Sequence, residues 1–204
     1  GTYAPIWGQE ACQIGSVYVL QKGDWIFPAF REIAATLMIG IALKNFMLYW
    51  MGNEMGSHAP EGVNIMPVSI PVGTHIPHAV GAAWAAKLRG DKVVTVAYFG
   101  DGATSKGDFH EAMNFAGVFK TPTIFFCQNN QFAISVPRSR QTASSTIAQK
   151  AIAYGFDGIQ VDGNDLFAVI MATKEAVNNV LYSAFPACRQ AMSLELPPHC
   201  ARQE

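Results

Sequence analysis

Two short apolar runs flank an amphipathic segment in the middle of the chain. The first run, residues 93–99, is rich in β-branched and aromatic side chains, which is typical of a buried strand, and it ends at the turn-forming triplet Gly-Asp-Gly of residues 100–102. The second run, residues 123–127, is followed closely by the Asn pair of residues 129–130. Apolar positions between the runs recur at helical spacing. The pattern therefore predicts a strand, a helix and a second strand.

The N-terminal third of the chain predicts helices and a long loop. A helix is expected to begin at residues 8–11, with Ile14, Val17 and Tyr18 facing inward. Residues 33–51 form an apolar stretch long enough to raise the question of a membrane span. Because a lysine and a glycine interrupt this stretch, a pair of buried or interface helices is the better interpretation. Residues 52–72 are rich in Gly, Pro and Asn and predict a loop.

Composition narrows the class of protein. The chain has 204 residues, half of them hydrophobic, and a formal net charge of −1. This size and composition predict a single globular α/β domain over residues 1–204, and the charge indicates neither nucleic acid nor a membrane as a partner. The absence of an initiator Met predicts that the chain is part of a longer protein.

The four cysteines carry little chemistry. Cys12, Cys127, Cys188 and Cys200 are widely scattered, and no pair has CxxC spacing. Neither a zinc site nor a disulfide framework is indicated. Reduced thiols and the lack of a signal peptide predict a cytoplasmic location, or the mitochondrial matrix in a eukaryote.

The polar residues that follow the two strands predict a site for magnesium and a phosphorylated ligand. Ligands bind beyond the carboxyl ends of parallel strands, where Asp101 offers an anionic oxygen and Asn130 a neutral one. A backbone carbonyl just after Asn130 could supply a third oxygen, and phosphate and water could complete the coordination. Gly102 has no Cβ, so its N–H can approach a phosphate closely. The helix that begins near Lys106 directs its positive end at the same anion.

Longer segments of the sequence resemble a known family. The spacing of Gly-Asp-Gly to Asn-Asn is similar to the fingerprint of thiamine-diphosphate proteins. The segments GDFHEAMNFAGVF and QNNQFAISVP resemble the alpha subunit of the decarboxylating component of bacterial 2-oxo acid dehydrogenase complexes, of the pyruvate and branched-chain types. The resemblance extends from residue 1 to about residue 173. It implies the thiamine diphosphate-binding fold, a mostly parallel sheet flanked by helices.

This resemblance also implies a role for individual residues. Magnesium would be bound by Asp101, Asn130 and the carbonyl of Phe132. The segment DWIFPAFRE is similar to the family's diphosphate-contacting segment, with Phe30 standing where the family has a tyrosine that precedes the phosphate-binding arginine. The residues that would contact the cofactor are Phe30, Arg31, Ile70, Val72, Asp101, Gly102, Ala103 and Asn130. Two alternatives stay open, a surface salt bridge for Arg31 and ordinary core packing for Val72.

A potassium site is implied as well, because branched-chain members of the family hold this ion in the loop before a helix. The matching residues are Ser69, Pro71, Thr74 and His75, with His75 in place of the usual glutamine. Neighbouring His78 is expected to be a hydrogen-bonded structural residue, since it has no paired motif.

By resemblance, the protein would decarboxylate a 2-oxo acid and transfer the acyl group to a lipoyl group of an acyltransferase. A beta subunit would supply the glutamate that activates the cofactor, which predicts an α₂β₂ assembly and no turnover by this chain alone. The family's N-terminal helical stretch and its C-terminal histidine loop are expected to be missing. The resemblance is expected to end near residue 184, without the strand that would place His199. His199 is thus a weak candidate for the catalytic histidine, with a frayed terminus as the alternative.

Two other functions remain open. One is the alpha subunit of acetoin dehydrogenase, and the other is a truncated homologue without catalytic activity. A nicotinamide-binding Rossmann domain is excluded because no GxGxxG follows a strand. The side chain of the 2-oxo acid is not specified by the sequence.

Overall fold

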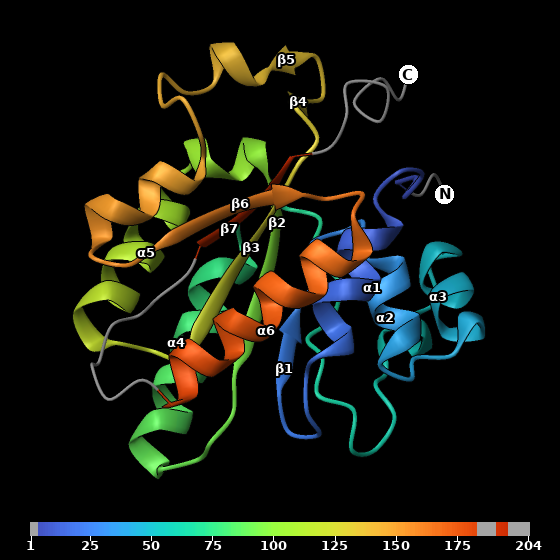
Figure 1. Ribbon diagram of the computed structural model, residues 1–204. Coiled ribbons are helices and arrows are strands. Elements are labelled where there is room, and N and C mark those ends of the chain that lie inside the picture. Colours follow the sequence, from blue (N-terminus) through green and yellow to red (C-terminus); the bar gives the residue numbers. More distant parts are fainter. Residues whose placement is uncertain (1–3, 183–190, 196–204) are drawn as a thin grey trace.

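A parallel sheet forms the centre of the molecule. The computed structural model describes residues 4–182 and 191–195 (Figure 1). In the described residues, five strands pair in the order β1-β2-β3-β7-β6, and every pair is parallel. Their bounds are β1 Trp25–Phe27, β2 Thr95–Gly100, β3 Thr123–Asn129, β6 Gly158–Asp162 and β7 Ala191–Glu195. The predicted α/β class and the two central strands are confirmed.

Helices cover both faces of this sheet (Figure 1). The α-helices are α1 Glu10–Tyr18, α2 Ile33–Met38, α3 Leu43–Trp50, α4 His75–Arg89, α5 Gly107–Phe119 and α6 Leu166–Tyr182. Shorter 3₁₀ turns are η1 Glu54–Ser57, η2 Asp101–Ser105, η3 Arg138–Arg140 and η4 Ala148–Tyr154, and β4 Phe132–Ala133 pairs with β5 Val136–Pro137 in a small hairpin.

Alternate residues of β2 and β3 pack into two separate cores. On one face, Tyr98 and Phe126 pack with residues of α1 and α6. On the other, Phe99 and Phe125 pack with residues of α4, α5 and η4. A strand buried on both faces needs apolar residues at every position, which is why these segments have continuous apolar runs.

The apolar stretch of residues 33–51 folds as two short helices. Gly40 has a φ of 109° and ends the first helix, α2, before α3 begins. Such a left-handed backbone is accessible to glycine at little cost. Among the described residues, no helix has the length and apolar character required to cross a bilayer. The predicted pair of helices is confirmed, but no residue of α3 is buried in this chain, so only the interface alternative suits α3 and it stays a prediction.

Helix α1 buries a different face from the one expected. Val17 is buried as predicted, but Ile14 and Tyr18 are 36% and 65% exposed. Gln13 and Ser16 are fully buried instead. They have partners there, because Ser16 Oγ lies 2.8 Å from the Tyr98 hydroxyl and Gln13 Nε2 donates to Gln128 Oε1 at 3.3 Å. The predicted inward face was therefore wrong, since hydrogen bonds to β2 and β3 decide which side of α1 faces the sheet.

The strand that was expected to be missing is β7. It lies between β3 and β6, and pairs with both of them in parallel. Its five residues show no strong hydrophobic pattern, and the backbone hydrogen bonds that stabilise it come from β3 and β6, which are distant in sequence. The expectation that this strand was absent is therefore wrong. His199 lies outside the described residues.

Candidate functional site

Asp101 and Asn130 lie at the same edge of the sheet. In the register of β2 and β3, Gly100 is paired with Gln128, so that both chains leave the sheet side by side. Asp101 follows β2 directly, and Asn130 follows β3. Both residues line one cleft of about 450 Å³. The structure thus brings together the two side chains predicted to bind magnesium.

Asp101 is the buried acid of this cleft. Asp101 is only 1% exposed, and its Oδ2 accepts a hydrogen bond from Gln141 Nε2 at 2.8 Å. Burial raises the pKa of Asp101, and the Gln141 hydrogen bond partly offsets this by favouring the ionised form. A divalent cation would offset the cost of burying this charge.

The surrounding donor set suits a hard cation with few protein ligands. No group of three or more His, Cys, Asp or Glu residues within the described part of the chain could hold a metal. Glu32 also lines the cleft, but both of its oxygens accept hydrogen bonds from protein groups, so Asp101 is the carboxylate available to a cation there, beside neutral oxygens. Magnesium bound to phosphate is held in this way, with water in the remaining positions.

The turn after β3 returns the chain towards Asp101. Asn130 Oδ1 accepts a hydrogen bond from the Phe132 N–H at 3.2 Å, and Gln131 has a positive φ of 73°. This turn places Phe132 and Ala133 on the wall of the same cleft. The backbone carbonyl of Phe132 consequently belongs to the segment that closes around the cleft, as its predicted role requires.

Gly102 allows this segment to approach closely. A Cβ added at Gly102 would lie 2.7 Å from the Cβ of Ala133, a distance that carbon atoms do not tolerate. The adjacent Ala103 is buried and also lines the cleft. Glycine at position 102 is therefore required by the packing of β4 against η2, and this packing also leaves the Gly102 backbone unshielded by a side chain.

Phe30 and Arg31 form another part of the wall. Both line the cleft, and the Arg31 guanidinium carbon lies 5.6 Å from the centre of the Phe30 ring. Arg31 Nη1 also donates to the carbonyl of Pro5 at 2.5 Å. Arginine is thus held at the cleft rather than extended into solvent, a position suited to contacting an anion.

Val72 is a cleft residue, whereas Ile70 is not. Val72 lines the cleft and is 43% exposed, so ordinary core packing does not explain it. Ile70 is 50% exposed and lies outside the set of cleft-lining side chains. Its predicted role depends on backbone groups and stays a prediction.

Comparison with known proteins agrees with this geometry. Residues 1–191 match the family described as dehydrogenase E1 component. The chain belongs to this family. The match extends well beyond residue 184, where the resemblance was expected to end.

Relatives within the E1 family are named for two different substrates. The "Pyruvate dehydrogenase E1 component subunit alpha" of Staphylococcus aureus is 46% identical over 199 residues, covering 98% of this chain and 54% of the relative. The "3-methyl-2-oxobutanoate dehydrogenase subunit alpha" of Mycobacterium tuberculosis is 47% identical over 197 residues, covering 97% of this chain and 54% of the relative. The chain spans about half the length of these relatives, and the near-equal identities do not distinguish between the two substrates.

The loop predicted to hold potassium forms a compact turn before α4. The N–H of Ser69 donates to the carbonyl of Ala29, and the N–H of Thr74 to that of Pro71. His75 is buried, with Nε2 2.7 Å from the Pro67 carbonyl oxygen. This burial lowers the pKa of His75. A potassium ion in this loop stays a prediction.

His78 has the structural role expected of it. Its Nδ1 lies 3.3 Å from Nδ1 of His75, one turn earlier on the same helix. The two rings are also close, with 5.5 Å between their centroids. No further chemistry at His78 is needed to account for its position.

A buried hydrogen-bond network that sequence reasoning missed includes two residues of the cleft wall, Glu32 and Gln128. Glu32 Oε1 accepts from Gln128 Nε2 at 2.5 Å, and Glu32 Oε2 accepts from the Arg31 N–H at 3.2 Å. Gln128 Oε1 in turn faces Gln13 Nε2 at 3.3 Å and Cys12 Sγ at 3.2 Å. The Arg31 carbonyl accepts from Gln13 Nε2 at 3.1 Å. The network therefore connects the backbone of Arg31 to the end of β3, two residues before Asn130.

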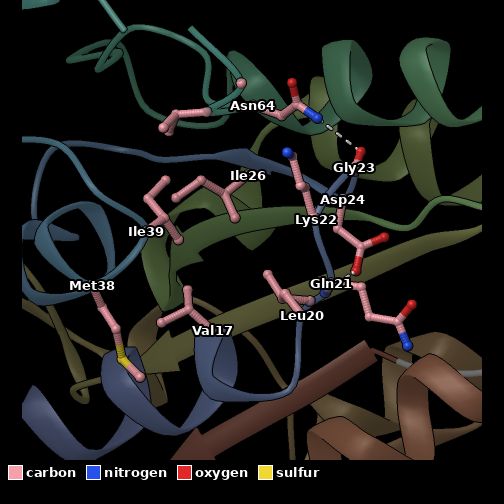
Figure 2. A pocket seen from close by; sticks show the side chains of 12 residues that line it. Val17, Leu20, Gln21, Lys22, Gly23, Asp24, Ile26, Met38, Ile39 and Asn64 are labelled. Atoms are coloured by element: carbon pink, nitrogen blue, oxygen red, sulfur yellow. Dashed lines mark hydrogen bonds between the residues drawn. The ribbon is translucent and has the colours of Figure 1, made fainter. Parts of the chain in front are cut away.

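A second cavity, of about 250 Å³, lies near the beginning of β1 and contains none of the predicted site residues (Figure 2). Two of its polar side chains have structural partners: Asp24 accepts from the backbone N–H groups of Gln21 and Val94, and Asn64 Nδ2 donates to the carbonyl of Gly23. The cleft beside Asp101 remains the better candidate for a cofactor site.

Proposed function

We propose that this chain is the cofactor-binding part of the alpha subunit of a 2-oxo acid dehydrogenase that binds thiamine diphosphate and Mg²⁺. The substrate would be pyruvate or a branched-chain 2-oxo acid, which is oxidatively decarboxylated before the acyl group passes to a lipoyl group. The main observation in support is that Asp101 and Asn130 meet at the ends of adjacent strands in one cleft. Membership of the E1 family and the names of this chain's relatives agree with the proposal.

The residues in the cleft suit the proposed ligand. Asp101, the Asn130 carboxamide and the Phe132 carbonyl would hold the magnesium ion. The Gly102 N–H and the Arg31 guanidinium would donate to the diphosphate oxygens. Val72, stiff and apolar, would support the organic part of the ligand.

Thiamine diphosphate, when bound, supplies the electron sink that makes decarboxylation of a 2-oxo acid feasible. The contribution of this chain would be to hold and orient the diphosphate half and to keep water from it. A beta subunit in an α₂β₂ assembly and a lipoyl acyltransferase are the proposed partners. Exposed apolar side chains on α3, including Leu43 and Met47, provide a surface that another subunit could cover.

Calorimetry and a reconstituted assay test this function. The protein should bind thiamine diphosphate only when Mg²⁺ is present. It should decarboxylate pyruvate or a branched-chain 2-oxo acid only after addition of a beta subunit. Decarboxylation by this chain alone would contradict the proposed division of the active site.

The same measurements distinguish the alternatives. Turnover of acetoin in preference to both 2-oxo acids would identify an acetoin dehydrogenase alpha subunit. A homologue without catalytic activity should bind the cofactor weakly or not at all, and Phe30 in place of the family's tyrosine is the observation that favours it. Tight binding with turnover would exclude that alternative.

A further inference from the structure

Gln9 has a buried carboxamide that no protein group satisfies. The residue is 0% exposed, and neither Nε2 nor Oε1 has a hydrogen-bond partner among the described residues. A buried polar group without a partner costs about 1–3 kcal/mol, so most such groups in native proteins are paired. Gln9 also lines the cleft that contains Asp101 and Asn130. An unpartnered carboxamide at this position indicates a ligand.

The main chain around Gln9 is fixed. Its N–H donates to the Ile6 carbonyl at 2.7 Å, and its carbonyl accepts from Cys12 Sγ at 2.9 Å. Cys12 and Gln13 both contact Gln128 Oε1, in the buried network that includes Glu32. Because this network anchors the first turn of α1, the residue cannot move away to satisfy its carboxamide elsewhere without breaking several hydrogen bonds. The backbone of Gln9 is therefore held in place before any ligand arrives.

The groups near Gln9 favour an anionic ligand. Gln9 is the residue that precedes α1, at the helix end where backbone N–H groups produce a positive partial charge. Arg31 reaches the same N-terminal segment through its hydrogen bond to the Pro5 carbonyl. Glu32 also lines the cleft, but its two oxygens already accept from Gln128 and from the Arg31 N–H. The Gln9 carboxamide nitrogen and the positive end of α1 are thus suited to acidic oxygens.

We propose that Gln9 is a further ligand-contacting residue, whose Nε2 donates a hydrogen bond to a phosphate oxygen of the diphosphate. Gln9 Oε1 then accepts from a water of the hydrated magnesium ion, which offers the donors that a phosphate lacks. This assignment rests on the proposed function, because it takes the diphosphate and its metal ion as the occupant of the cleft. It adds α1 to the elements that bind the ligand.

The substitution Gln9→Leu separates a ligand contact from a structural one. Leucine has a similar size and no polar atoms, so the variant should unfold at the same temperature as the parent or higher without ligand. Its affinity for magnesium pyrophosphate, measured by calorimetry on the full chain, should fall about tenfold or more, as expected for one hydrogen bond to a charged group. The exposed Gln149→Leu is the matched control and should leave the affinity unchanged.

Two outcomes would overturn this assignment alone. One is a Gln9→Leu variant that binds magnesium pyrophosphate as tightly as the parent, and the other is a loss of affinity for thiamine diphosphate without any loss for pyrophosphate. A parent protein that binds neither ligand would overturn the proposed function together with the assignment. If Gln9→Leu does not fold, Gln9 has a structural role and the assignment fails unless Gln9→Glu restores folding. That variant keeps the shape but places a carboxylate against the phosphate, so its affinity should be lower than that of the parent, and the difference from the parent should be larger at pH 8 than at pH 6.

Discussion

Replacing Gly102 with alanine should separate the β4–β5 hairpin from the turn that carries Asp101. The added Cβ would lie 2.7 Å from the Cβ of Ala133, well inside the normal contact distance of two carbon atoms. Since η2 follows directly from β2, in the middle of the sheet, the hairpin is the more easily displaced of the two. Its displacement would move Phe132 and Ala133 away from the cleft.

The size of this effect follows from the cost of overpacking. Forcing an extra methyl group into a packed site costs about 1–3 kcal/mol. For a chain of this length, each kcal/mol lowers the unfolding temperature by about 2–4 °C, so Gly102→Ala should lower it by roughly 2–12 °C. Affinity for magnesium pyrophosphate should fall as well, because the hairpin carries the Phe132 carbonyl.

Thermal unfolding of two further variants makes the test specific. The double variant Gly102→Ala/Ala133→Gly removes the clashing methyl group and should recover most of the lost stability. Gly81→Ala introduces the same methyl group into α4, where it would meet no atom within 4 Å apart from the local backbone of its own helix, and should stabilise the protein by about 0.5–1 kcal/mol. The reasoning is refuted if Gly102→Ala unfolds at the parental temperature, or if the double variant is no more stable than Gly102→Ala.

Three other outcomes are expected from the buried acid and the hairpin. Without metal at pH 8, Asp101→Asn should unfold at a higher temperature than the parent. It should also lose the Mg²⁺-dependent stabilisation that is expected with pyrophosphate. The control Asp91→Asn, in an exposed ion pair, should alter neither property. Because burial raises the pKa of Asp101, the parent should lose stability relative to Asp101→Asn as the pH rises from about 4 through the raised pKa. The Mg²⁺-dependent stabilisation of the parent should grow over the same interval. Equal Mg²⁺-dependent stabilisation at pH 5 and pH 8 would contradict this. Ile134 is fully exposed and has a φ of 56°, a backbone conformation that asparagine adopts more readily than a β-branched residue. Ile134→Asn should therefore raise the free energy of unfolding by about 1 kcal/mol, whereas Ile134→Val should leave it unchanged. A less stable asparagine variant would show that the backbone there is not strained.

The central part of the site could be predicted because its signals are local. The runs that form β2 and β3 are continuously apolar after Thr95 and Thr123, and polar residues follow where these runs end. Parallel strands bring such ends to one edge of a sheet, which is why Asp101 and Asn130 could be placed together without coordinates. The break at Gly40 in the apolar helix pair was readable for the same reason.

The supporting residues could not be predicted because their partners are distant. Gln141 reaches Asp101 across 40 positions of sequence, and Glu32 reaches Gln128 across 96. No local pattern marks these side chains, and burial of Gln13 depends on a partner in another element. β7 escaped prediction in the same way, since its hydrogen bonds come from β3 and β6 on its two sides.

The inner position of β7 has a consequence for synthesis on the ribosome. Among the described strands β7 is made last, yet it fills the place between β3 and β6. Until it emerges, the nascent chain has unpaired backbone edges on both of those strands. Unprotected edges of this kind attract chaperones or pair with strands of other chains. Translational pausing before β7 has emerged from the ribosome should therefore promote aggregation, whereas a pause after it has emerged should not.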